Sequence, residues 1–207
     1  MTQILRFETM QFRTLTAWLM ANFIGGCIIG YLESNGLQFM ATLMLSGAIA
    51  GSAQWVVLKC LGYRGRRWSL WPLVSCVGWI AGVMLSLSLS EPIAYIKDGL
   101  IQNLGLWNIF GLNVVNRTLW ITVMAISQGT ILSISMQSRA QVISVWLLAS
   151  WVGAALHGAI ATALCSAYCQ VLPPSLMGII EGGGWAAYGV VTGLALVRFR
   201  QQGDEQL

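Results

Sequence analysis

The sequence predicts an all-α integral membrane protein, a six-helix bundle built from three tandem helical hairpins. Hydrophobic residues make up 57% of the 207 residues and charged residues only 9%, whereas soluble domains carry about 25% charged residues. Six apolar stretches are long enough to cross a bilayer, which takes roughly 20 residues in a helix. None has the short alternating pattern of β-barrel strands. We therefore expect one polytopic transmembrane domain over residues 1–207.

The predicted helices span residues 15–34, 38–59, 69–90, 118–137, 142–164 and 176–198. The longest connection, residues 91–117, is rich in apolar and aromatic side chains, begins near Pro92 and is interrupted by glycines. It is expected to form an amphipathic segment in the outer membrane interface. A re-entrant or pocket-capping element is the alternative.

The distribution of lysine and arginine predicts the orientation. With a cytoplasmic N-terminus, Lys97 and Arg117 face the outer side, and the other nine basic residues face the cytoplasm. Those nine are Arg6, Arg13, Lys59, Arg64, Arg66, Arg67, Arg139, Arg198 and Arg200. We expect both termini to be cytoplasmic, in a bacterial cytoplasmic or thylakoid membrane.

The first, third and fifth predicted helices share a pattern that indicates an internal repeat. In each, a tryptophan is followed four residues later by a polar residue and seven later by glycine, all on one helix face. The three sets are Trp18, Asn22, Gly25; Trp71, Ser75, Gly78; and Trp146, Ser150, Gly153.

Three further motifs carry a resemblance to a known group of proteins. They are Gly47-x3-Gly51-x2-Gln54-Trp55, Gly78-Trp79-x2-Gly82 and Tyr188-Gly189-x3-Gly193-Leu194-Ala195-Leu196. With these motifs the chain resembles uncharacterised multi-pass membrane proteins of cyanobacteria. The resemblance implies a helical membrane fold and a bacterial host, and it implies no particular reaction.

Polar side chains inside the apolar stretches are candidates for helix packing. Helices in lipid associate through close backbone contact and interhelical hydrogen bonds. Glycine pairs supply the first, and five polar residues are expected to supply the second: Asn22, Gln54, Ser75, Gln128 and Ser150. Asn22 and Gln54 are expected to meet. As an alternative, these groups line a polar pocket or coordinate a pigment or ion.

His157 and Glu181 lie at similar depth in the last two predicted helices. Ionisable groups at membrane depth are costly and usually face a partner or a cavity, so we predict that these two point inward and touch. The contact is either structural or part of a ligand or proton site that includes Gly182 and Gly183. The glycine run 182–184 indicates tight packing, a kink or a broken helix of the kind that lines transporter sites.

Other chemistry finds little support in the sequence. The five cysteines (Cys27, Cys60, Cys76, Cys165 and Cys169) are expected to be buried free thiols, and no metal site is predicted. The chain lacks a Walker A sequence and the His-Glu-x2-His motif of metalloproteases. Ser52 with His157 is only a loose match to an intramembrane protease. We expect neither an enzyme nor a nucleic-acid-binding protein.

Two function classes remain. The first is a non-enzymatic structural or interaction protein of a membrane complex, or a binder of hydrophobic pigment, with the bilayer and a membrane complex or homo-oligomer as partners. The second is a small transporter or permease with its polar site near His157 and Glu181. A water-accessible cavity that reaches Glu181 would favour transport, whereas a dry interior with His157 among aliphatic residues would favour the first class. The sequence identifies no cofactor.

Overall fold

The computed structural model describes residues 2–63, 65–92, 94–95, 98–99, 108–134 and 138–204, and all regular structure in these residues is helical. The all-α class is therefore confirmed for this part of the chain. Six of its helices have at least 15 residues: α1 (Thr2–Leu32), α3 (Ser46–Cys60), α4 (Trp71–Ser88), α6 (Asn108–Ser133), α7 (Arg139–Tyr168) and α8 (Gly178–Asp204).

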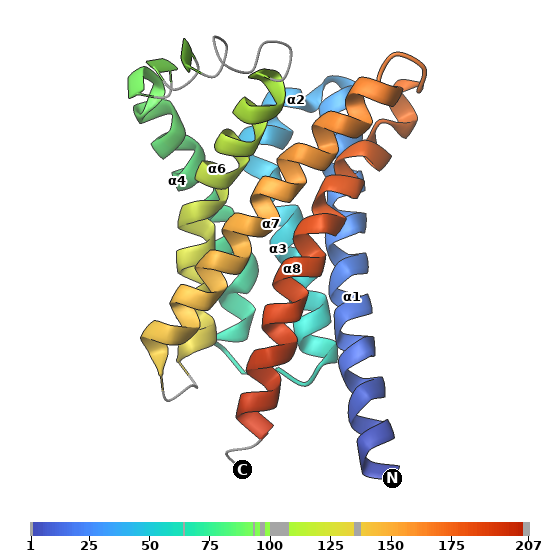
Figure 1. The fold of residues 1–207 in the computed structure, drawn as a ribbon, viewed down its shortest axis with the longest axis vertical. Helices are drawn as coiled ribbons and strands as arrows, with labels where there is room; N and C mark the ends of the chain where they lie inside the picture. The colour runs from blue at the N-terminus through green and yellow to red at the C-terminus, as the bar shows by residue number, and fades with distance from the viewer. Residues whose placement is uncertain are drawn as a thin grey trace.

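The chain reverses direction between α1 and α3 at Asn35 and Gly36. Gly36 has φ +92°, a conformation that glycine adopts at little cost because it has no Cβ. The Asn35 side chain donates a hydrogen bond to the Tyr31 carbonyl at 2.7 Å. The return path holds the short helix α2 (Gln38–Met40) between two stretches of wider helical turns, Glu33–Leu37 and Ala41–Leu45. α3 then runs back along α1 (Figure 1).

The helix boundaries differ from the predicted ones in two important places. α1 begins at Thr2, well before residue 15. Residues 108–117, expected in an interfacial segment, instead form the first turns of α6. Most of the remaining residues of that segment, 91–107, lie outside the residues that the structure describes. Arg117 is therefore not in an outer loop, as the charge count assumed, but inside a helix that has no other charged residue.

The long helices form a closed ring in chain order. Each packs against the next along the chain, and α1 packs against α8 in the most extensive contact of all (Figure 1). Trp18, Trp71 and Trp146, one each from α1, α4 and α7, meet inside the ring and are fully buried. Their ring centroids lie 6.2, 6.2 and 6.0 Å apart in edge-to-face arrangements, the geometry that aromatic quadrupoles favour. The three repeated tryptophans thus join alternate helices at one point.

Glycines let neighbouring helices approach closely. A Cβ added at Gly51 would overlap Ser75 of α4, and one added at Gly82 would overlap the Trp120 backbone of α6. A Cβ at Gly189 would lie 3.0 Å from the Asn22 Cβ of α1. Larger side chains at these positions would push the helices apart.

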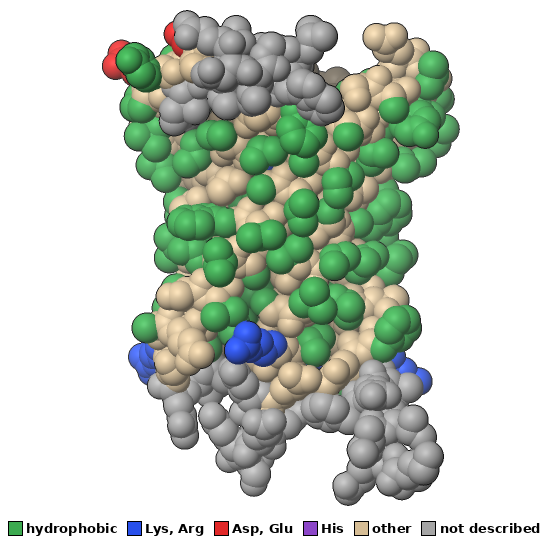
Figure 2. Space-filling model, viewed as in Figure 1, with side chains coloured by type: hydrophobic (Ala, Val, Ile, Leu, Met, Phe, Trp, Pro, Cys, Tyr) green, Lys and Arg blue, Asp and Glu red, His purple; other side chains and the backbone are tan. Residues whose placement is uncertain are grey.

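In the described part of the chain, five helical segments are long and apolar enough to cross a membrane. The first, Met10–Cys60, is 51 residues long and contains the reversal at Gly36, so it includes most of α1 and all of α3. The other four are Trp68–Ser88, Ile109–Ser133, Arg139–Tyr168 and Pro174–Gln201. In Figure 2 apolar side chains cover the middle of the visible face, basic groups lie toward the end that holds both termini, and acidic groups lie at the opposite end. This is the surface pattern of a membrane protein.

Candidate functional site

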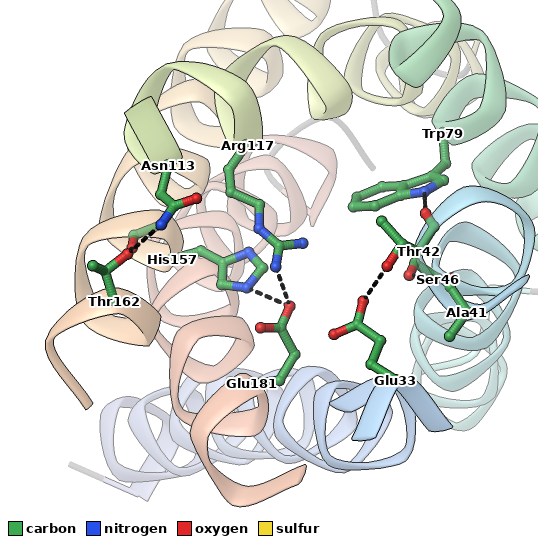
Figure 3. A network of polar contacts seen from close by, with 11 residues as sticks. Glu33, Ala41, Thr42, Ser46, Trp79, Asn113, Arg117, His157, Thr162 and Glu181 are labelled. Atoms are coloured by element: carbon green, nitrogen blue, oxygen red, sulfur yellow. Dashed lines mark hydrogen bonds and ion pairs between the residues drawn. The ribbon is translucent and has the colours of Figure 1, made fainter. Parts of the chain in front are cut away.

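A cluster of charged side chains lies where α6, α7 and α8 meet, in the half of the bundle remote from the termini (Figures 1 and 3). Glu181, in the first turn of α8, uses the same oxygen, Oε1, for two contacts. Arg117 Nη2 of α6 lies 2.9 Å from it, and His157 Nε2 of α7 also lies 2.9 Å from it. The predicted contact between His157 and Glu181 is therefore confirmed.

The cluster is almost entirely enclosed by protein. The relative exposure of the side chain is 0% for His157, 10% for Glu181 and 15% for Arg117. An unpaired charge at this depth would be strongly destabilising, and pairing with hydrogen bonds offsets that cost. The contact of Glu181 with both a guanidinium and an imidazole explains how a carboxylate is accommodated here.

Sequence reasoning missed Arg117 because it assigned this residue to a loop. The available signal was its setting: a single arginine directly before the apolar stretch 118–137, with Leu112, Val114 and Val115 just upstream. Such an arginine within a long apolar helix normally faces an acidic partner or a cavity. The sequence does not show which acidic residue that partner is.

The glycines around the cluster bring its helices into contact. A Cβ at Gly184 would overlap the His157 ring, and one at Gly30 would lie 2.6 Å from the Glu181 Cβ. Gly182 packs against Cys27 of α1, and Gly183 faces Leu164 of α7. α8 runs unbroken from Gly178 to Asp204, so the glycine run serves close packing and does not interrupt the helix. Gly182 and Gly183 stay predicted ligand residues, with these contacts as their observed setting.

A cavity of about 230 Å³ extends from the cluster toward the helix ends remote from the termini. Glu181, Arg117 and Glu33 contribute charged groups to its wall, and Asn113 and Thr162 contribute neutral polar groups. Segments distant in sequence therefore build it together: the end of α1, the start of α6, the second half of α7 and the start of α8. A volume of this size accommodates several waters or one small solute.

Glu33, which directly follows the last residue of α1, lines one side of the cavity (Figure 3). Its Oε1 accepts a hydrogen bond from Thr42 Oγ1 at 2.7 Å. Among the described residues no basic side chain lies within 4.0 Å of the Glu33 carboxylate. Asn113 Nδ2 donates one hydrogen bond to Thr162 Oγ1 at 2.9 Å, and this amide also has a second N–H and an oxygen acceptor.

Two buried nitrogens of the cluster, Arg117 Nη1 and His157 Nδ1, have no hydrogen-bond partner among the residues that the structure describes. Buried polar atoms are nearly always hydrogen-bonded, so each exception calls for an explanation such as a water or a ligand. Arg117 lines the cavity, but both unpaired nitrogens have almost no accessible surface, so a solute in the cavity does not reach them.

A disulfide between Cys165 and Cys169 lies at the end of α7, and both cysteines line the cavity. The expectation of free thiols was wrong for this pair, because a spacing of four brings two side chains of a helix onto the same face. Cys27, Cys60 and Cys76 are free, but Cys60 is exposed and the other two are only partly buried.

The five polar packing residues lie apart from the cavity lining and are all fully buried. Asn22 Oδ1 accepts from Gln54 Nε2 at 2.9 Å, which is the expected meeting of these two amides. The remaining bonds are Trp71 Nε1 to Gln54 Oε1 at 3.1 Å, Gln128 Nε2 to Gln54 Oε1 at 3.2 Å, Gln128 Nε2 to Ser75 Oγ at 2.8 Å and Tyr188 Oη to Ser150 Oγ at 3.4 Å. These bonds link α1, α3, α4 and α6 around the tryptophan cluster, and α7 to α8.

Among the described residues no three His, Cys, Asp or Glu side chains form a group that could hold a metal ion. In its described residues the protein is all-helical, with segments long and apolar enough to span a membrane and a charged cavity among them. No family model, curated protein or solved structure matches the chain, and nothing in these comparisons points to catalysis.

Proposed function

We propose that the protein is a small membrane transporter, a permease that binds a polar solute in the cavity beside Glu181. The observation that carries the proposal is the cavity itself, because it reaches a buried charged cluster and has polar side chains on several helices. Ligand sites in membrane proteins commonly combine a concave pocket with a few convergent polar groups. The structural or pigment-binding role also expected from the sequence stays a prediction, with no specific observation in its favour.

The proposed architecture is a six-helix bundle of three tandem hairpins with both termini in the cytoplasm. The meeting of Trp18, Trp71 and Trp146 supports a threefold repeat, since equivalent positions of three hairpins come together at one point. The basic residues near the terminal end support a cytoplasmic location for that end. The cavity would then face the outer compartment.

In this proposal the structure represents an outward-facing state. The tryptophan cluster and the amide network of Gln54 and Gln128 fill the bundle on the cytoplasmic side of the cavity. Transport requires this packed region to open while the outer end closes, as in alternating access. A scaffold protein would have no such second state.

Cysteine labelling at Thr162, on the cavity wall, tests the proposal without knowledge of the solute. Thr162→Cys is made in a background with all native cysteines replaced by serine, and a small membrane-impermeant methanethiosulfonate is applied to right-side-out or inside-out vesicles. Modification is expected from the outer side, and more slowly from the cytoplasmic side as the protein changes state. Ala154→Cys, at a fully buried position of the same helix, is the control and should stay unmodified.

Each result bears on the proposal. Labelling of Thr162→Cys from the outer side alone contradicts transport and leaves a binding site. Absence of labelling from either side, in a variant that is inserted and folded, contradicts the cavity as a solute site altogether.

A further inference from the structure

The disulfide between Cys165 and Cys169 lies in the wall of the cavity. Both residues line it, and both are partly exposed. They belong to the end of α7 that is remote from the termini (Figure 1), so a small solute that enters the cavity from this end can reach the bond. In the proposed orientation this end faces the outer compartment, the kind of environment in which disulfides form and persist.

The bond adds little to the architecture of the bundle. It joins residues four apart in sequence, within α7 and the residue that caps it, and so it connects no two helices. The Cys169 N–H already donates to the Cys165 carbonyl at 2.9 Å, which closes the same turn without the bond. A disulfide restricts the unfolded chain least when the loop that it closes is short. Reduction of this bond should therefore leave the fold intact.

The reaction partner of the bond must come from outside the chain. Cys27, Cys60 and Cys76 are the free cysteines, and none of them lines the cavity. Exchange of a disulfide requires a thiolate that reaches one of its sulfurs. The cavity, with a volume of about 230 Å³, admits a small molecule that carries such a group, whereas it has no room for the chain of another protein.

We infer that Cys165 and Cys169 form a reversible dithiol–disulfide couple that reacts with small thiols entering the cavity. The thiolate of one thiol molecule attacks one sulfur, which forms a mixed disulfide and releases the other cysteine as a thiolate. A second thiol molecule attacks the outer sulfur of the mixed disulfide, and a small disulfide leaves. The two thiol molecules lose two electrons and two protons in total, and the cysteine pair gains them. The inference uses the cavity as an access route and does not depend on transport.

Reduction of the folded protein tests the inference. Cys27, Cys60 and Cys76 are replaced by serine, so that every thiol detected comes from the pair. The protein in mild detergent is treated with increasing concentrations of 2-mercaptoethanol and quenched with acid, and after removal of the reductant it is denatured and labelled with a maleimide. We expect label on both cysteines, a rate proportional to the thiol concentration, and unchanged helix content. Addition of 2-hydroxyethyl disulfide should then restore the bond.

A matched variant tests the access route. Cys165→Ser and Cys169→Ser remove the native pair, and Ser166→Cys with Gln170→Cys places a pair of the same spacing at exposed positions that do not line the cavity. Both proteins are oxidised before the assay. A thiol-terminated polyethylene glycol, which is too large for the cavity, should reduce the exposed pair at least about tenfold faster than the native pair, whereas 2-mercaptoethanol should reduce both at similar rates.

Reduction of the native pair only after sodium dodecyl sulfate unfolds the protein would overturn the inference, because the bond would then be purely structural. Equal rates of the two pairs with the large thiol would overturn the cavity as the route. The proposed transport function is judged independently by the labelling of Thr162→Cys, in a background that lacks this disulfide.

Discussion

Replacing Arg117 with methionine tests whether the charged cluster is held together by its own partners. Methionine fills a similar volume but removes the guanidinium that lies 2.9 Å from Glu181 Oε1, and it leaves that carboxylate buried with His157 alone. Removing one partner of a buried ion pair typically costs about 3–5 kcal/mol, because the remaining charge loses its compensation. We predict a loss of that size in the free energy of unfolding.

The matched change in the other partner of the ion pair is Glu181→Gln. It leaves Arg117 buried without its carboxylate and should lower the free energy of unfolding by a similar amount. The double variant, Arg117→Met with Glu181→Gln, removes both charges and should be much less unstable than the sum of the single losses. We expect an interaction energy of about 2 kcal/mol or more between the two positions. Arg139→Met, at the exposed start of α7, is the control and should change stability by less than about 0.5 kcal/mol.

The unfolding free energies can be measured by titrating the protein from mild detergent into sodium dodecyl sulfate, with helix content and tryptophan fluorescence as two readouts. If the losses of the single variants add within about 0.5 kcal/mol in the double variant, the two residues do not interact. The arrangement of the cluster described above would then be incorrect.

Three further predictions concern the packing and the disulfide. Gln54→Leu removes an amide that is hydrogen-bonded to three other buried side chains, and it should lower the unfolding free energy by about 1–3 kcal/mol. Gln38→Leu, at an exposed position, is the control and should have little effect. Similar losses of stability in the two variants would contradict the buried network. Gly82→Ala forces a Cβ onto the α6 backbone and should cost about 1–3 kcal/mol in the same titration, and an unchanged stability would mean that α4 and α6 are not in tight contact. Under denaturing conditions a maleimide should add three labels to the chain, one for each free cysteine, with two more added only after reduction; mass spectrometry that finds five labels before reduction would exclude the disulfide.

The sequence identified the interior better than it identified the site. Trp18, Trp71 and Trp146 were predicted as equivalent positions because a helix places residues four and seven apart on one face, and all three are buried at the same point. Asn22 and Gln54 could be paired because neighbouring antiparallel helices bring positions of equal depth together. His157 and Glu181 followed from the same reasoning.

The sequence analysis did not predict Arg117 and Glu33 as site residues, because their positions depend on where a helix begins and where the chain reverses. Arg117 joins the site only because α6 starts at Asn108, a boundary that the apolar pattern placed about ten residues too late. Glu33 reaches the cavity because α1 ends in a reversal at Gly36. It shares the cavity wall with Arg117 and Asn113 of α6, an arrangement of distant segments that no local pattern encodes.

The ion pair between Arg117 of α6 and Glu181 of α8 has a consequence for the synthesis of the protein. Arg117 leaves the ribosome within α6, two helices before Glu181 is made. At the insertion stage it therefore enters the membrane without its carboxylate partner, at a cost of about 2.5–3.5 kcal/mol if it reaches the centre of the bilayer. The apolar remainder of α6 must offset this cost until α8 arrives. Chains truncated before α8 should therefore hold α6 in the membrane less firmly than the complete protein does.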